Sequence, residues 1–328
     1  MTTARTALIT GVLGQDGSYL AQLLLQHGYQ VIGVKRPDSD LSNHQYLGIQ
    51  QQVKYLDCDL RDETAVMNLI KQIEPDELYH LGGLSAPGQS WEEPKEYTLT
   101  NALGTLYILE AVLKHSPKTR LLNAATSEMF GVSHDHGLQT EHTTFQPTNP
   151  YAVTKIYSYW MGNIYKKSYD LFVANSILFS HESPLRGRHF VTRKISQGVA
   201  KIKLGLADHI NLGNIESRRD WGFAGDYVRA MYLMLQQSQP DDYVISTGQV
   251  HSLREFLALA FAAVGITDWE QYITIDPKLY RPIDLDSLYG SSDKARLTLH
   301  WQPQVTFPEL VKMMVEADLK RLSVRHPS

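Results

Sequence analysis

Cysteine is almost absent from this sequence of 328 residues, in which Cys58 is the only one. A single thiol cannot form an intrachain disulfide, which argues against the small disulfide-stabilised folds of secreted proteins. Cys58 lies in the alternating segment VKYLDCDL. We therefore expect a half-buried thiol in a strand and no catalytic role for it.

Long apolar runs and an excess of positive charge are also missing. No apolar run reaches the roughly 18 residues that a membrane-spanning helix needs. The first segment, MTTARTALITGVLG, has too short an apolar run for a signal peptide, so we expect a cytoplasmic protein. The net charge of −4 and the isoelectric point near 6.3 give no reason to expect nucleic acid or a membrane as partner.

What is present is typical of a globular protein: 43% hydrophobic and 20% charged residues. Strand-length apolar segments alternate with helix-length segments in the first half of the chain. This alternation predicts an α/β fold with a Rossmann-type, doubly wound parallel sheet and ligands at the carboxyl ends of the strands. Strands are expected at 6–10, 30–36, 53–60, 77–83, 120–126 and 171–179, and helices at 18–28, 63–75, 100–116, 253–265 and 307–322.

The second half of the chain is less regular. We expect a cofactor-binding domain at 1–172 and a smaller α/β C-terminal substrate domain at 173–328, with segments around 222–250 rejoining the first domain.

A glycine-rich turn, ITGVLGQDGSYL, places Gly11, Gly14 and Gly17 directly after the first strand and before the first helix. Glycines let the backbone turn sharply and let a pyrophosphate approach the amides of a helix N-terminus. An ordinary structural turn is the alternative. The context predicts a dinucleotide site that includes Gln15 and Asp16.

The second strand ends in GVKRPDSD, which bears on the choice of nicotinamide cofactor. Lys35 and Arg36 favour the 2′-phosphate of NADP, with Ser39 as a further donor. Asp38 and Asp40 repel phosphate, so NAD is possible and a solvated charged loop is the other interpretation. We expect NADP.

Tyr151 and Lys155 in NPYAVTK are spaced i, i+4, which on a helix places both side chains on one face, about 6 Å apart along the axis. A free phenol has a pKa near ~10. A nearby ammonium and an oxidised nicotinamide ring would favour the phenolate and lower that pKa. An exposed helical pair is the alternative, but the pair follows the glycine turn by roughly the length of one half of a Rossmann fold, which favours the functional interpretation.

A carboxylate stands beside two hydroxyls in NAATSEMFG, where Thr126, Ser127 and Glu128 follow a buried strand. Glu128 is a candidate general base. It could instead cap a helix or pair with a basic residue. Asp59, at the end of the third strand, is placed for the adenine edge of a dinucleotide or for capping the next helix.

Several segments together resemble the extended short-chain dehydrogenase/reductases that act on nucleotide sugars, and among them the GDP-mannose 4,6-dehydratases. The resemblance spans nearly the whole chain. It is carried by TGVLGQDGSYL, ATSEMFG, PYAVTKIYSYW, HESPLRGRHFVTRKI, LGNIESRRDWGFAGDYV, STGQVHSLREF and YRPIDLDSLYGSSDKA.

The resemblance implies conversion of GDP-D-mannose to GDP-4-dehydro-6-deoxy-D-mannose and water, with NADP regenerated in each turnover. Tyr151, assisted by Lys155, would remove the proton of the C4 hydroxyl, and Glu128 would abstract the C5 proton and help to expel the C6 hydroxyl. Thr126 would hold the C4 oxygen, with help from Ser127.

The same resemblance implies further binding residues and a homo-oligomer, either a dimer or a tetramer. The implied cofactor-binding residues beyond those above are Leu60, Leu81, Ser85, Tyr97, His181 and Arg186. The implied substrate-binding residues are Ser85, Thr126, Lys194, Arg219, Arg281 and Asp284.

The chain departs from the family pattern around the site but not at the proposed chemical groups. The departures are Pro37 and Asp38 after Arg36, Leu84 and Ala86 in LGGLSAP, Leu185 and Arg188 in LRGR, and Thr148-Asn149 in place of the usual Arg-Ser before Pro150. They could change which sugar nucleotide is preferred.

Other interpretations are open from the sequence. A different nucleotide-sugar dehydratase, an epimerase or a non-catalytic Rossmann protein would share the glycine turn. An epimerase has no need of the Glu128 base, and a non-catalytic protein has no need of the Tyr151–Lys155 pair. His134, Asp135, His136, Glu141 and His142 are residue types that bind zinc, but the expected chemistry needs no metal and we assign none.

Overall fold

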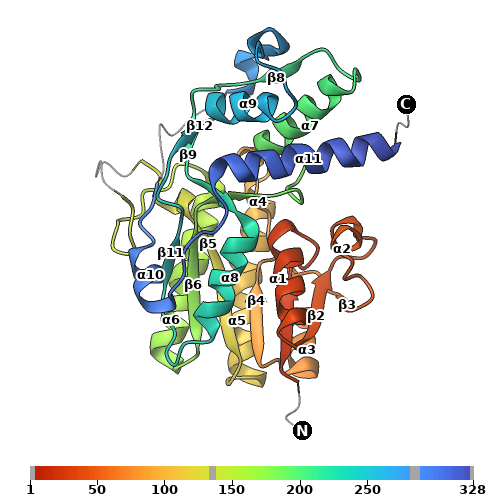
Figure 1. Ribbon diagram of the computed structural model, residues 1–328. Helices are drawn as coiled ribbons and strands as arrows, with labels where there is room; N and C mark the ends of the chain where they lie inside the picture. The colour runs from red at the N-terminus through yellow and green to blue at the C-terminus, as the bar shows by residue number, and fades with distance from the viewer. Residues whose placement is uncertain (1–3, 133–137, 281–288, 326–328) are drawn as a thin grey trace.

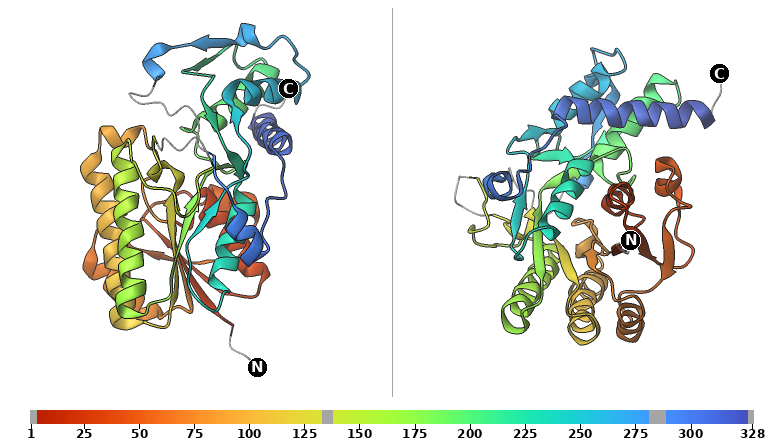
Figure 2. Two further views of the ribbon diagram at one scale, coloured as in Figure 1. Left: turned by 90° about the vertical axis from the view of Figure 1, so that its left-hand side faces the viewer. Right: turned by 60° about the horizontal axis from the view of Figure 1, so that its bottom comes forward.

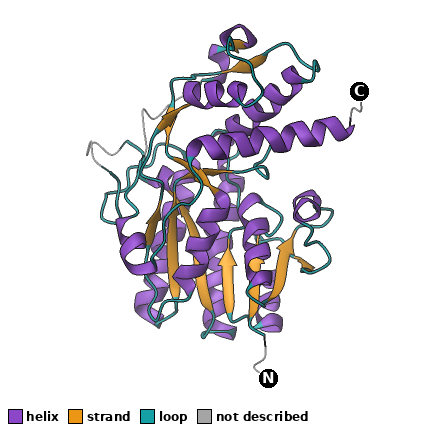
Figure 3. Ribbon diagram, in the orientation of Figure 1, coloured by secondary structure: helices purple, strands orange, loops and turns teal. Residues whose placement is uncertain are grey.

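The computed structural model describes residues 4–132, 138–280 and 289–325. These residues form a large lobe built on a parallel sheet and a smaller lobe above the carboxyl ends of its strands (Figures 1 and 3). No helix in the described ranges combines the length and the apolar character needed to cross a membrane.

The sheet of the large lobe has, within the described residues, seven strands in the order β11-β6-β5-β4-β1-β2-β3, and every neighbouring pair is parallel. The order changes direction between β1 and β4, and ligands of such sheets bind at this switch point, outside the carboxyl ends of the strands. The predicted Rossmann-type fold is confirmed. The strands are β1 (Thr6–Thr10), β2 (Gln30–Lys35), β3 (Lys54–Asp57), β4 (Glu77–His80), β5 (Arg120–Thr126), β6 (Val173–Leu178) and β11 (Tyr243–Ile245).

Helices cover both faces of the sheet, as Figure 2 shows. One face carries α1 (Gln15–Gln26), α8 (Ala224–Leu235) and α10 (Asp293–Leu299), and the other carries α3 (Glu63–Ile73), α5 (Gly104–His115) and α6 (Pro150–Tyr169). Successive side chains of a strand point to opposite faces. Ala7 and Ile9 accordingly join the core under α1 and α8, whereas Leu8 joins the core under α3 and α5.

The smaller lobe has its own apolar core, which packs three helices against a short parallel pair of strands. Arg193 and Asp318, both buried, form an ion pair that joins two of these helices. The elements are α7 (Val191–Lys203), α9 (Leu253–Ala262), α11 (Phe307–Arg325), β8 (Ile210–Leu212) and β13 (Ile273–Ile275).

Short helical and extended elements complete the two lobes. The helical ones are α2 (Ser42–Leu47), η1 (Gln89–Trp91), α4 (Pro94–Tyr97), η2 (Thr98–Leu103), η3 (Ser127–Met129), η4 (Glu270–Tyr272) and η5 (Pro277–Leu279). The extended ones are β7 (Ser180–Glu182), β9 (Arg218–Arg219), β10 (Trp221–Phe223) and β12 (His251–Ser252). The helix expected at 100–116 is divided, because a π-helical turn, η2, precedes α5.

The chain crosses between the lobes more than once. β6 begins at Val173 and pairs with β5, so a boundary at residue 172 would separate two neighbouring strands of one sheet. β11 pairs with β6, and α8 packs against α1. We therefore propose that the large domain includes β6 and regains the chain from α8 to β11.

Candidate active site

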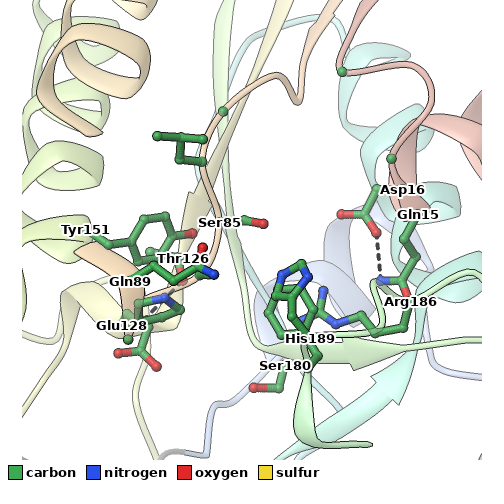
Figure 4. A pocket seen from close by; sticks show the side chains of 18 of the residues that line it. Gln15, Asp16, Ser85, Gln89, Thr126, Glu128, Tyr151, Ser180, Arg186 and His189 are labelled. Carbon is green, nitrogen blue, oxygen red and sulfur yellow. Dashed lines mark hydrogen bonds between the residues drawn. The ribbon is translucent and has the colours of Figure 1, made fainter. Parts of the chain in front are cut away.

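A cavity of about 970 Å³ opens at the carboxyl edge of the sheet, between the two lobes. Thr126, Glu128 and Tyr151 lie on one wall in Figure 4, and Asp16 and Arg186 lie on the opposite wall. Both lobes therefore contribute side chains to one site.

The glycine turn between β1 and α1 forms one end of this cavity. Gly11 has a φ of +68°, and a Cβ atom there would lie 2.8 Å from the Cα of Gly82. A Cβ at Gly17 would collide with the carbonyl oxygen of Gly11. Because Gly14 precedes α1 and the first amides of a helix have no partner within it, the turn can hold an anionic group such as a pyrophosphate.

Side chains of this turn bind the chain segment that follows β6. Gln15 Nε2 donates to the carbonyl of His181 at 3.0 Å, and Gln15 Oε1 accepts from Ser183 Oγ at 2.7 Å. Asp16 Oδ2 lies 2.8 Å from His181 Nε2. Burial disfavours both charged forms, yet His181 keeps the pKa of Asp16 below its ordinary value and Asp16 raises the pKa of His181. GQDG and HES, two motifs noted in the sequence, are thus in direct contact.

The end of β2 places two cations, Lys35 and Arg36, at the cavity, and Lys35 is held in an ion pair. Lys35 Nζ bonds Asp57 Oδ1 at 2.6 Å, whereas the exposed Arg36 lines the cavity together with Ser39. Asp38 adopts a left-handed backbone with a φ of 57°, and Asp40 bonds the hydroxyl of Ser42.

Asp59 at the end of β3 also lines the cavity, but it does not cap α3. Asp62 is the N-cap of α3 and accepts from the amide of Ala65. Asp59 instead pairs with Arg61 at 2.7 Å, and Arg61 also bonds Glu96. The capping alternative for Asp59 is therefore wrong.

Leu60, Leu81 and Ser85 line the same cavity. Tyr97 supports the wall from behind: it is 1% exposed and packs edge-on against Tyr151, with ring centroids 6.2 Å apart.

Tyr151 and Lys155 lie on the first turns of α6 and face the cavity. Lys155 Nζ donates to the carbonyl of Ala124 at 2.9 Å, and burial lowers the pKa of Lys155 to about 8. Burial raises the pKa of Tyr151, while a hydrogen bond from Thr126 opposes the rise. Desolvation of the phenol outweighs the favourable contacts, and the lowering of the Tyr151 pKa by an ammonium together with an oxidised nicotinamide ring stays a prediction.

Glu128 lies on η3, immediately after β5, and shares the cavity wall with Thr126 and Tyr151 (Figure 4). Its amide donates to Thr126 Oγ1 at 3.3 Å. Its carboxylate oxygen Oε2 accepts from Asn149 Nδ2 at 2.9 Å. The described structure therefore gives Glu128 an amide partner, where the sequence had suggested a basic partner as one alternative. Ser127, though buried, also lines the cavity.

The small-lobe wall carries three basic side chains, Arg186, Lys194 and Arg219. Lys194 is exposed and Arg219 is 9% exposed, and both line the cavity. Arg186 forms an ion pair with Glu182 at 3.0 Å and lies 3.5 Å over the ring of Phe190. Arg281 and Asp284 lie outside the described residues.

Sequence reasoning missed several residues of the site. Gln89, Ser180 and His189 line the cavity, and none of them was singled out, although His189 lies within the segment HESPLRGRHFVTRKI. Asn149, the partner of Glu128, could have been found, because an asparagine before Pro150 at a helix start is a typical N-cap.

No group of three metal-ligating side chains occurs within the ranges that the structure describes. His134, Asp135 and His136 lie outside those ranges. Glu141 Oε1 accepts from the amide of Val244 at 2.8 Å, which gives this carboxylate a structural contact. Burial raises the pKa of the Cys58 thiol to about 11, so the thiol stays protonated.

Comparisons with known proteins agree with this geometry. The family model described as GDP-mannose 4,6 dehydratase matches residues 8–314. The chain is 44% identical over 328 residues to GDP-mannose 4,6 dehydratase 2 of Arabidopsis thaliana, covering 96% of this chain and 87% of that protein.

Two solved structures share the fold. A UDP-glucose 4-epimerase of Thermotoga maritima with UDP-glucose has a TM-score of 0.86 at 22% identity, covering 97% of this chain and 99% of that one. A dTDP-glucose 4,6-dehydratase of Streptomyces venezuelae with NAD bound has a TM-score of 0.84 at 22% identity, covering 98% and 99%. On the family model and the sequence identity, the chain belongs to the GDP-mannose 4,6-dehydratase family.

Proposed function

We propose that this protein converts GDP-D-mannose to GDP-4-dehydro-6-deoxy-D-mannose and water. One observation carries the proposal: in a member of this family, the carboxylate of Glu128 lies on the same cavity wall as Tyr151 and Thr126. Oxidation at C4 alone would need the phenol, whereas loss of water also needs a base for C5.

The cavity would hold a nicotinamide cofactor, whose chemistry would be to store the hydride of C4 and to return it at C6. The glycine turn fits its pyrophosphate, since side chains at Gly11 or Gly17 would fill or distort the turn. Arg36 and Ser39 support NADP, because a guanidinium and a hydroxyl suit a 2′-phosphate. Asp59, which pairs with Arg61 and lines the cavity, would contact the adenosine portion.

Tyr151 takes the proton of the C4 hydroxyl. Thr126, which already bonds the phenol, holds the C4 oxygen. Lys155 places a positive charge on the same face of α6, and this charge favours the phenolate as the proton moves.

Glu128 acts once C4 is a ketone, because the ketone acidifies the proton on C5. Its carboxylate takes that proton while the C6–O bond breaks, and the departing oxygen leaves as water with a proton supplied by Glu128. Tyr151 then gives a proton to C5 as C6 is reduced. The protons and electrons balance, so no external oxidant is needed.

The guanosine diphosphate portion would bind the small-lobe wall. Lys194 and Arg219 support this placement, because ammonium and guanidinium groups bind phosphate oxygens. The family resemblance adds Arg281 and Asp284 to this group.

We also infer a homo-oligomer. Val153, Tyr157, Trp160 and Ile164 are spaced along one face of α6 and are 55%, 37%, 51% and 48% exposed. A stripe of large apolar residues at helical spacing favours burial against a second copy. Trp160→Glu should convert the oligomer to monomer in light scattering, whereas Lys201→Glu on α7 should not. A monomeric parent protein would contradict the inference.

The direct test is to incubate the purified protein and NADP with GDP-mannose and to follow the nucleotide sugar by mass. Loss of one water is expected. An isomer of unchanged mass would indicate an epimerase, and turnover of a uridine or cytidine sugar alone would contradict the guanosine assignment.

A further inference from the structure

Asn149 is joined to both of the elements that carry the proposed acid–base groups. Its Oδ1 accepts from the amide of Ala152 at 2.9 Å and so caps α6, the helix of Tyr151 and Lys155. Its Nδ2 donates to Glu128 Oε2 at 2.9 Å. One planar side chain thus connects the start of α6 with the carboxylate on η3.

The orientation of this amide is determined by its partners. A backbone N–H can only donate, so it requires the oxygen of Asn149, and the amide nitrogen must then face Glu128. That nitrogen can only donate, so Glu128 Oε2 must accept. Because Asn149 Oδ1 caps α6, the atom of Asn149 that contacts Glu128 is Nδ2.

The bond from Asn149 is made to one of the two carboxylate oxygens of Glu128. Oε2 is held by Asn149, and Glu128 lines the cavity together with Thr126. A hydrogen bond to one oxygen restricts the rotation of the carboxyl group. A base held in place gives a higher reaction rate than a mobile one, because misplacement by about 1 Å can cost about 10²-fold in rate.

We propose that Asn149 is a positioning residue for the second step, aligning Glu128 for removal of the C5 proton; this inference rests on the proposed function. The usual serine of the family could also cap α6. Serine has one polar side-chain atom, whereas asparagine has two. When the hydroxyl of a serine caps the helix, that side chain has no second polar atom with which to contact Glu128. The departure noted in the sequence therefore adds a contact to the base.

A purely structural role makes a different prediction. Loss of a cap would disturb the start of α6 and hence Tyr151, so C4 oxidation and water loss would fall together. Loss of alignment of Glu128 would slow water loss while C4 oxidation continues.

Asn149→Asp and Asn149→Ser separate these roles, because both residues are good N-caps. Asp replaces the donor by an oxygen that repels Glu128, and Ser removes the reach to Glu128. The parent and both variants are compared in single turnovers with GDP-mannose and with GDP-mannose deuterated at C5, and thermal unfolding is recorded for each.

We expect water loss to slow about 10–100-fold in Asn149→Asp and by a smaller factor in Asn149→Ser. The C4 ketone that retains its C6 hydroxyl should accumulate, with the near-ultraviolet absorbance of the reduced cofactor. The C5 isotope effect should rise in both variants, and the unfolding temperature should stay close to that of the parent.

Unchanged rates and isotope effects in both variants would overturn the inference, as would an equal fall of oxidation and water loss. If the parent protein releases no water from GDP-mannose, the proposed function fails. If the parent releases water and both variants release it equally fast, only the role of Asn149 is refuted.

Discussion

Substitution Glu128→Gln removes the proposed base while keeping the size of the side chain. The amide oxygen of glutamine can still accept from Asn149 Nδ2, so the local hydrogen bond and the fold should survive. A general acid–base group typically contributes about 10²–10⁴-fold. This corresponds to about 3–5 kcal/mol of transition-state stabilisation, so water loss should nearly stop.

The assay is a single turnover in which the nucleotide sugar is analysed by mass. Because Tyr151, Lys155 and Thr126 are untouched, oxidation at C4 should persist, and the 4-keto sugar that retains its C6 hydroxyl should accumulate. Glu110→Gln on α5 removes a carboxylate that does not line the cavity and serves as the matched control. Water release by Glu128→Gln at a rate close to that of the control would refute the assignment of the base.

Two further predictions follow from other parts of the site. Below about pH 8 Lys155 is protonated in both the folded and the unfolded state, and the folded state bears the full cost of burying the charge. Above that pH the unfolded state binds more protons, because the ordinary pKa of lysine is higher than the pKa of Lys155 in the folded protein. The contribution of Lys155 to the free energy of unfolding therefore rises with pH. The unfolding temperature of Lys155→Met minus that of the parent should therefore fall as the pH rises above 8, and a pH-independent difference would contradict the lowered pKa. Arg36→Ala should weaken NADP binding about 10–100-fold in a fluorescence titration and leave NAD binding nearly unchanged, since only NADP carries the 2′-phosphate; equal losses for both cofactors would contradict this role of Arg36.

Local patterns predicted the elements of the large lobe well. β1 and the turn after it were visible as an apolar run followed by glycines, because each depends on residues close together in the chain. The Tyr151–Lys155 spacing likewise predicted a shared helical face, and both side chains line the cavity.

Contacts between distant segments were not predictable in the same way. Asp16 meets His181 across 165 residues, and Arg61 meets Glu96 across 35 residues. No local propensity specifies such pairs, since they depend on how the chain returns after several crossovers.

The sequence by itself determined which chemical groups the protein has and in what order: a glycine turn, a carboxylate after a buried strand, and a phenol one helical turn before an ammonium. These follow from backbone preferences and from hydrophobic periodicity, which act over a few residues. Only the tertiary structure decided that Glu128 and Tyr151 share one wall, that Asn149 links Glu128 to the start of α6, and that burial raises the pKa of the phenol. Distance, orientation and desolvation depend on every segment packed around the cavity, so no short stretch of sequence can determine them.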